Sequence, residues 1–220
     1  MKNTIYFFNF INILRNWKNK NRFRIFEKKN NILINSKNIK ELNLKINGKN
    51  NSVLIKENIN LRKLNIDISG DNNELIIDRN TFIQKSEFNI IGNNNKLMIG
   101  KNNNIYGIQT WQFENNGRIE IGNNCLFSSD IEIRNTDSHP IYDLYSNKRL
   151  NYNRDVLIKN SVWLGKGVKV LKGVTIEEGN VIGMGTIVTK SILEKNSIIV
   201  QNNKIIRKNI KWEKDYKKEY

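Results

Sequence analysis

The sequence predicts an all-β protein built as a solenoid, in which short parallel strands coil around one shared core. The chain of 220 residues contains no Ala and 41 Asn, a composition that disfavours helices. Its N-terminal half repeats with a step of 22 residues, and its C-terminal half repeats with a step of six. Self-similarity at a fixed step is typical of repeat architectures, so the repeats decide the fold class.

The longer repeat consists of a Gly-containing turn followed by a strand-like segment. Its members are Gly48, Gly70 and Gly92 and, in the segments that follow, Ile55, Ile77, Ile99 and Ile121. Asn surrounds these glycines. Asn tolerates left-handed backbone conformations, and its side chain can bond a neighbouring turn. We therefore expect stacked Asn residues at the corners of the coils.

The shorter repeat places an apolar residue at every sixth position. These positions are Ile158, Leu164, Val170, Ile176, Ile182 and Val188. A six-residue unit is one short strand and one turn, and three units form an 18-residue triangular coil that stacks on its neighbours. Cys125 stands at an inward-type position of an earlier stretch with the same step, so packing is expected for it rather than nucleophilic chemistry.

We divide the chain into a basic and apolar segment at 1–31, a β-helix over 32–200 with an inserted loop at about 135–155, and a basic tail at 201–220. Apolar residues of the first segment recur at helical spacing, so a short amphipathic helix is expected there. Its apolar run is too short to cross a bilayer, and no small-residue cleavage site follows. A helix packed on the main domain or on a partner subunit is the first interpretation, and a basic helix lying on a membrane surface is the alternative.

The charge of the chain is concentrated at its two ends. The net charge is +16, of which +7 lies in residues 1–31 and +4 in residues 204–220. Such a surface favours anionic partners. Nucleic acid is an unfavoured partner, because no platform interleaves basic and aromatic residues. One His and one Cys exclude metal sites that need several imidazoles or thiolates, so no metal is expected. The single Cys fits a reducing compartment, and we expect a cytoplasmic protein, with the inner face of the membrane as an open alternative.

The six-residue step is lost between about Asn135 and Asp155, and this stretch holds the His and the Pro of the chain, His139 and Pro140. A loop that projects from a rigid solenoid is a natural place for a site. Histidine titrates near neutrality, so a neutral imidazole can act as the general base for a sugar hydroxyl. The same loop contains Tyr142 and Arg149, which we expect to bind the substrate.

Several motifs resemble those of the hexapeptide-repeat acyltransferases. They are Asp137-Ser138-His139-Pro140, then Ser161-Val162-Trp163-Leu164-Gly165, Val181-Ile182-Gly183-Met184-Gly185 and Val188-Thr189-Lys190. The resemblance covers roughly residues 119–208, and its order and spacing are similar to those of the galactoside and maltose O-acetyltransferases. The loop motif together with Val162-Trp163-Leu164-Gly165 is similar to the polysialic acid O-acetyltransferases of bacterial capsules.

This resemblance implies a left-handed parallel β-helix that forms a homotrimer, with acetyl-CoA in a groove between neighbouring subunits. His139 matches the catalytic His and would deprotonate the acceptor hydroxyl, while Trp163 would form a wall of the acetyl and acceptor pocket. Trp111 lies beside Gln109, which falls near an acceptor-contacting position of the sugar acetyltransferases. The remaining matches all concern the donor: Lys166 and Met184 along the pantetheine arm, Thr189 and Lys190 near the nucleotide, and Lys204 and Arg207 at the CoA phosphates.

The sequence departs from the family after the β-helix. The segment Gln201-Asn202-Asn203-Lys204 lacks the Pro of the family's Asn-Pro-Ala-Lys-like turn, which weakens the match at Lys204 and Arg207. The first hypothesis is O-acetyl transfer to a hydroxyl of a bacterial surface glycan, such as capsule, lipopolysaccharide or a sialic acid polymer. The alternatives are N-acetyl transfer to an amino sugar on a nucleotide carrier and a β-solenoid that binds a partner without chemistry.

Overall fold

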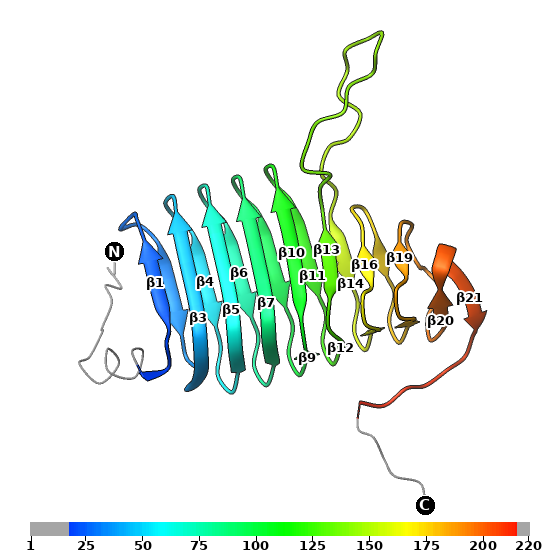
Figure 1. Cartoon of the computed structure of the whole chain (residues 1–220), viewed down its shortest axis with the longest axis horizontal. Helices are drawn as coiled ribbons and strands as arrows, with labels where there is room; N and C mark the ends of the chain where they lie inside the picture. Colours follow the sequence, from blue (N-terminus) through cyan, green and yellow to red (C-terminus); the bar gives the residue numbers. More distant parts are fainter. Residues whose placement is uncertain (1–17, 215–220) are drawn as a thin grey trace, which may run out of the picture.

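The computed structural model describes residues 18–214, which form a β-solenoid of stacked coils with one long projecting loop (Figure 1). Its first face is the sheet of β2 (Asn31–Ile34), β4 (Ser52–Ile55), β6 (Glu74–Ile77), β8 (Lys96–Ile99), β11 (Arg118–Ile121), β14 (Val156–Ile158) and β17 (Thr175–Ile176). The predicted all-β solenoid is therefore confirmed.

Two further faces complete each coil. The second face contains β9 (Asn104–Ile105), β12 (Leu126–Phe127), β15 (Trp163–Leu164), β18 (Val181–Ile182) and β20 (Ile198–Val200). The third face contains β10 (Ile108–Phe113), β13 (Ile131–Arg134), β16 (Lys169–Val170) and β19 (Ile187–Val188). We call the edge between the first and second faces the first corner, that between the second and third faces the second corner, and that between the third and first faces the third corner.

In the N-terminal coils, long strands cover the second and third faces together. They are β3 (Asn38–Asn47), β5 (Asn60–Ser69) and β7 (Phe82–Ile91), and β1 (Arg22–Ile25) pairs with the third-face part of β3. The strands turn at the second corner through Glu41, Lys63 and Lys85, whose φ angles are 56°, 57° and 48°. β7 then pairs with β9 at its start and with β10 along its later part.

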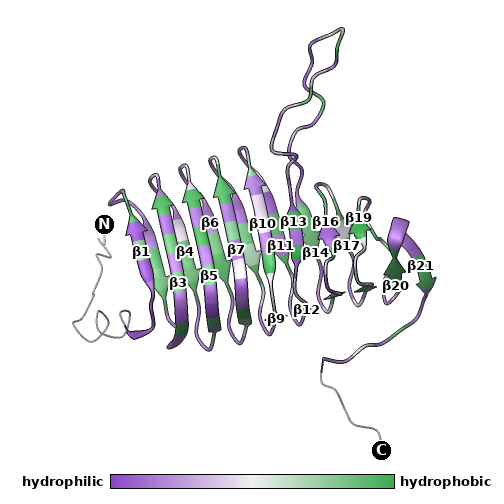
Figure 2. Ribbon diagram, viewed as in Figure 1, coloured by the Kyte–Doolittle hydropathy of each residue, from purple (hydrophilic) through white to green (hydrophobic). Residues whose placement is uncertain are grey.

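The strand register confirms both repeats. Ile55, Ile77, Ile99 and Ile121 pair in succession on the first face at the predicted step. Ile158 pairs with Ile176, as expected for triangular coils of the shorter repeat. Apolar and polar residues alternate along the strands (Figure 2), and the inward columns form one continuous core. Cys125 belongs to this core, and burial raises the pKa of its thiol to about 11, which keeps the thiol protonated at neutral pH.

A buried ladder of asparagines follows the long coils. Asn51, Asn73 and Asn95 are each 1% exposed. The Oδ1 atom of Asn73 accepts a hydrogen bond of 2.9 Å from the backbone N–H of Asn95. Its Nδ2 atom donates to the carbonyl of Gly92 at 2.8 Å. Each amide therefore satisfies backbone groups of the next coil, which water cannot reach.

Replacing Asn73 by alanine is expected to lower the free energy of unfolding by about 3 kcal/mol. The reason is that the Asn95 N–H and the Gly92 carbonyl each lose the hydrogen bond that the Asn73 amide makes to them. The control is Asn65→Ala on the exposed side of β5, which should change stability by less than ~0.5 kcal/mol. Denaturant unfolding of both variants measures the difference. Equal stability of the two variants would show that the hydrogen bonds of the asparagine ladder do not stabilise the solenoid.

The helix expected within residues 1–31 does not extend through Arg22–Ile25, and this part of the prediction is wrong. These residues form strand β1, and the solenoid includes residues before 32. Phe23 and Ile25 alternate with arginines and pack against the core, which is a strand pattern rather than a helical one. Residues 1–17 of the expected helix lie outside the described residues. Within 18–214, no helix has the length and apolarity needed to span a membrane.

The C-terminal end of the β-helix reverses direction. A short 3-10 helix at Gln201–Asn203 leads into β21 (Lys204–Arg207), which pairs antiparallel with β20. Ile205 packs against the end of the core. Of the predicted basic tail, residues 201–207 thus form regular structure that closes the last coil.

Candidate active site

The predicted loop projects from the third corner, between the end of β13 and the start of β14 (Figure 1). Its base is attached to the coil that follows. The Nζ atom of Lys172 forms an ion pair with Asp137, and it also donates to the carbonyl of Tyr152 at 3.3 Å. Both limbs of the loop are therefore attached to one lysine, which fixes where the loop leaves the solenoid.

The backbone of His139 is fixed by its neighbours at this base. Its N–H donates to the carbonyl of Asp137 at 2.8 Å, and its own carbonyl accepts from Nδ2 of Asn151 at 2.8 Å. The amide of Asn151 is 8% exposed and also donates to Asp137 at 2.9 Å. The hydrogen bonds that residues 18–214 make with His139 involve its backbone, and its side chain is exposed. The loop therefore holds an available imidazole on a fixed peptide.

Asp137 is the charged centre of this anchor. Partial burial raises the pKa of its carboxyl, but hydrogen bonds from Lys172 and Asn151 and the charges of Lys172 and Arg154 outweigh burial and leave the pKa below its ordinary value. The carboxylate form is the one that these donors stabilise. The contribution of the anchor to stability is thus complete above the ordinary aspartate pKa and is lost as the pH falls through the lowered one.

The two other loop residues predicted to bind substrate have different environments. Arg149 pairs with Glu114 at 2.7 Å, and its guanidinium lies 4.8 Å from the ring centre of Tyr152. Tyr142 is 53% exposed and forms a single antiparallel bridge with Arg149. Arg149 thus attaches the loop to the solenoid, whereas Tyr142 presents its ring to solvent.

Trp163 lies at a different corner from the loop. It begins β15 directly after the first corner, and its side chain is 38% exposed. Its ring contacts that of Trp212, with the ring centres 5.9 Å apart. Because the whole first face separates the first corner from the third, one chain does not bring Trp163 to the base of the His139 loop.

Lys166 and Met184 occupy the second corner on successive coils. The N–H of Gly185 donates to the carbonyl of Lys166 at 2.8 Å, and the Lys166 side chain pairs with Asp130 at 3.5 Å. A Cβ atom on Gly165 would lie 2.8 Å from the backbone nitrogen of Met184, so glycine is required for this close stacking. The result is a thin corner along which an extended ligand arm can lie. Met184 is 75% exposed on it.

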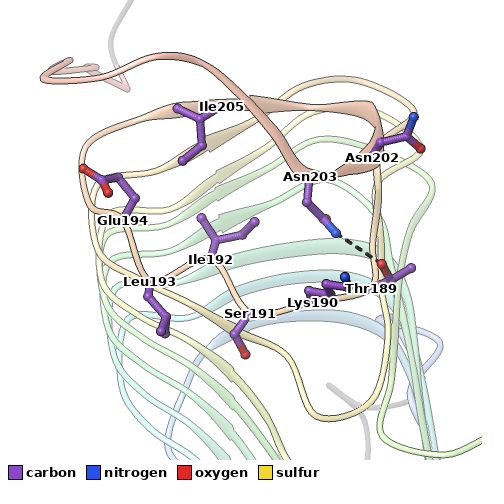
Figure 3. A pocket seen from close by; sticks show the side chains of 9 residues that line it. All are labelled: Thr189, Lys190, Ser191, Ile192, Leu193, Glu194, Asn202, Asn203 and Ile205. Atoms are coloured by element: carbon purple, nitrogen blue, oxygen red, sulfur yellow. Dashed lines mark hydrogen bonds between the residues drawn. The ribbon is translucent and has the colours of Figure 1, made fainter.

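Thr189 and Lys190 line an open pocket of about 620 Å³ at the C-terminal end (Figure 3). Nδ2 of Asn203 donates to the Thr189 hydroxyl at 3.2 Å across it. Lys204 stands between two lining residues, Asn203 and Ile205, without lining the pocket itself, and Arg207 lies further along β21. The structure thus brings Thr189, Lys190 and Lys204 into one region, whereas Arg207 lies at the opposite end of β21, paired with Ile198.

Trp111 is half-buried on the third face, where the Arg134 guanidinium lies 5.4 Å from its ring centre. Beside it, a pocket of about 330 Å³ at the second corner is lined by Gln109 together with residues that the sequence reasoning missed: Lys85, Tyr106, Ser129, Asp130, Glu132 and Lys169. These residues come from four successive coils. The 22-residue step predicts that Lys85 and Gly107 lie at the same corner of successive coils. It does not predict that the side chains at this corner surround a cavity.

No cluster of three or more His, Cys, Asp or Glu residues within 18–214 is arranged to hold a metal ion. The predicted site residues offer the imidazole of His139, the rings of Trp163 and Tyr142, and ammonium groups such as those of Lys166 and Lys190. They suit proton transfer and the binding of a phosphate-bearing ligand.

Comparison with known proteins finds similarity to bacterial acyltransferases. Residues 155–190 match the bacterial transferase hexapeptide family (six repeats). The structure is similar to the polySia-specific acetyltransferase NeuO, with a TM-score of 0.80 and 32% identity over 87% of this chain and 88% of that one. It is also similar to the polysialic acid O-acetyltransferase OatWY, with a TM-score of 0.66 and 29% identity over 86% and 92% of the two chains.

A curated relative agrees with these structures over a shorter segment. The polysialic acid O-acetyltransferase of Neisseria meningitidis is 50% identical over 48 residues, which span 22% of this chain and 22% of that protein. The fold is that of the left-handed β-helix acetyltransferases, as the resemblance implied. The chain belongs to the hexapeptide-repeat transferase family, in which its relatives over most of the chain are polysialic acid O-acetyltransferases.

Proposed function

We propose that the protein transfers the acetyl group of acetyl-CoA to a hydroxyl of a sialic acid polymer, with His139 as the general base. The observation that carries this proposal is the similarity to NeuO over 87% of this chain and 88% of that one, at 32% identity. The net charge of +16 supports a polyanionic acceptor.

The chemistry is a direct transfer. The imidazole of His139 takes the proton of the acceptor hydroxyl, the oxygen attacks the thioester carbonyl, and the CoA thiol leaves with a proton returned to it. The donor would lie along the second corner past Lys166 and Met184, with its phosphates toward Thr189 and Lys190. Tyr142 and the cavity beside Gln109 and Trp111 are the acceptor-side surfaces.

A homotrimer would complete this site. His139 leaves the third corner and Trp163 stands at the first, which supports a groove formed by two chains. The loop also carries apolar and aromatic side chains that suit a subunit contact, since six of them are more than half exposed: Ile141, Tyr142, Leu144, Tyr145, Leu150 and Tyr152. We place this enzyme in the cytoplasm, where acetyl-CoA is made.

The test is transfer from labelled acetyl-CoA to a panel of sialylated polymers, neutral glycans and amino-sugar nucleotides. We expect product with the sialic acid polymer, with the label in a base-labile ester. A label in an amide of the amino-sugar nucleotide would replace the proposal by N-acetyl transfer. Calorimetry that finds no binding of CoA would replace it by a non-enzymatic solenoid.

A further inference from the structure

The last described residues form a strap across the coils. After β21, residues 208–214, which we call the C-terminal strap, run back along the first corner (Figure 1). Lys208 pairs with Glu194 at 3.3 Å, and the N–H of Ile210 donates to the carbonyl of Asn196 at 2.8 Å. Further along, Lys214 donates to the carbonyl of Asn102, which belongs to a much earlier coil. The strap is thus attached at both of its ends.

Trp212 is the middle attachment of this strap. Its indole N–H donates to the carbonyl of Ser161 at 2.9 Å, directly before β15. Its ring then meets the Trp163 ring at an angle of 48°, with the centres 5.9 Å apart. This separation lies within the range of favourable aromatic pairs. The exposed Trp163 ring is therefore in contact with a ring from the last described residues of the chain.

We propose that Trp212 is a positioning residue, which fixes the Trp163 ring in the orientation needed to form a wall of the acetyl-transfer site. This inference rests on the proposed function. An unsupported indole that is 38% exposed could adopt several rotamers, and each wrong one would displace the wall against which the reacting groups are aligned. The hydrogen bond to Ser161 fixes the orientation of the Trp212 ring relative to Trp163, because Ser161 belongs to the backbone segment that leads into Trp163.

The test is a double-mutant cycle on the full chain, with acetyl transfer to the sialic acid polymer as the assay. We expect Trp212→Ala to lower kcat/KM by roughly tenfold and Trp212→Phe, which keeps a ring, by roughly threefold. In the Trp163→Ala background, Trp212→Ala should have no further effect beyond about twofold, because it acts through the ring already removed. The control is Lys211→Ala, whose side chain on the same strap is 84% exposed and should leave kcat/KM unchanged.

Circular dichroism measures the contact between the Trp163 and Trp212 rings independently of acetyl transfer. The paired indoles should give an exciton couplet in circular dichroism, which both Trp163→Phe and Trp212→Phe remove and Lys211→Ala retains. An active wild type with an unimpaired Trp212→Ala, or a loss that adds fully to that of Trp163→Ala, would overturn this inference alone. A folded wild type that shows the couplet but transfers no acetyl group would overturn the proposed function together with it.

Discussion

Alanine in place of His139 is expected to lower turnover by ~100-fold or more, because the acceptor hydroxyl loses the group that takes its proton. The fold should survive, since the hydrogen bonds of His139 within residues 18–214 are made by its backbone N–H and carbonyl, which alanine retains. Steady-state kinetics with the sialic acid polymer and thermal denaturation measure the two effects separately.

The matched control for this variant is Lys148→Ala, an exposed residue of the same loop. It should retain turnover, which would show that disturbing the loop surface is not enough. Undiminished turnover of His139→Ala would remove the imidazole from the mechanism. A large fall in the melting temperature would instead assign the loss to the loop anchor around Asp137.

Mixing two strongly impaired variants is expected to restore much of the lost activity. If each site takes His139 from one subunit and Trp163 from its neighbour, then His139→Ala and Trp163→Ala chains refolded together in equal amounts should form intact sites at about a quarter of positions. The expected activity is therefore roughly a quarter of that of the wild type. The separate corners of the loop and of β15 are the reason for this expectation.

The control is to mix each variant with itself and to mix the preformed oligomers without refolding. Neither should regain activity, because no site would then combine two chains of different type. A refolded mixture that stays inactive would contradict a shared site. A sedimentation measurement that finds monomers with full activity would contradict the homotrimer itself.

The repeats made the scaffold predictable. Ile158 and Ile176, or Ile55 and Ile77, are related by fixed steps, and a fixed step leaves each inward residue one possible neighbour in the stack. The asparagine corners followed from local backbone preference, since Asn94 and Asn116 adopt left-handed φ angles of 58° and 59°. The projecting loop was located by the loss of the same periodicity.

Other parts depended on contacts that no period records. Arg22–Ile25 was assigned to a helical segment because the apolar residues before it have helical spacing, whereas pairing with β3 decides its conformation. Trp212 follows the last repeat, so nothing in the sequence linked it to Trp163. The pairing of Arg149 with Glu114 likewise joins the loop to an earlier coil at a separation that neither repeat step contains.

The insertion at the third corner leaves the stacking around it intact. Ile121 still pairs with Ile158 and Ile133 with Val170, although the chain makes its long excursion between them. Sequence changes in the loop beyond its anchored base therefore leave the stacked coils, and the peptide that holds His139, in place. Related enzymes could diverge in the polysaccharide that they acetylate through the outer part of this loop, while keeping its base and the donor side unaltered.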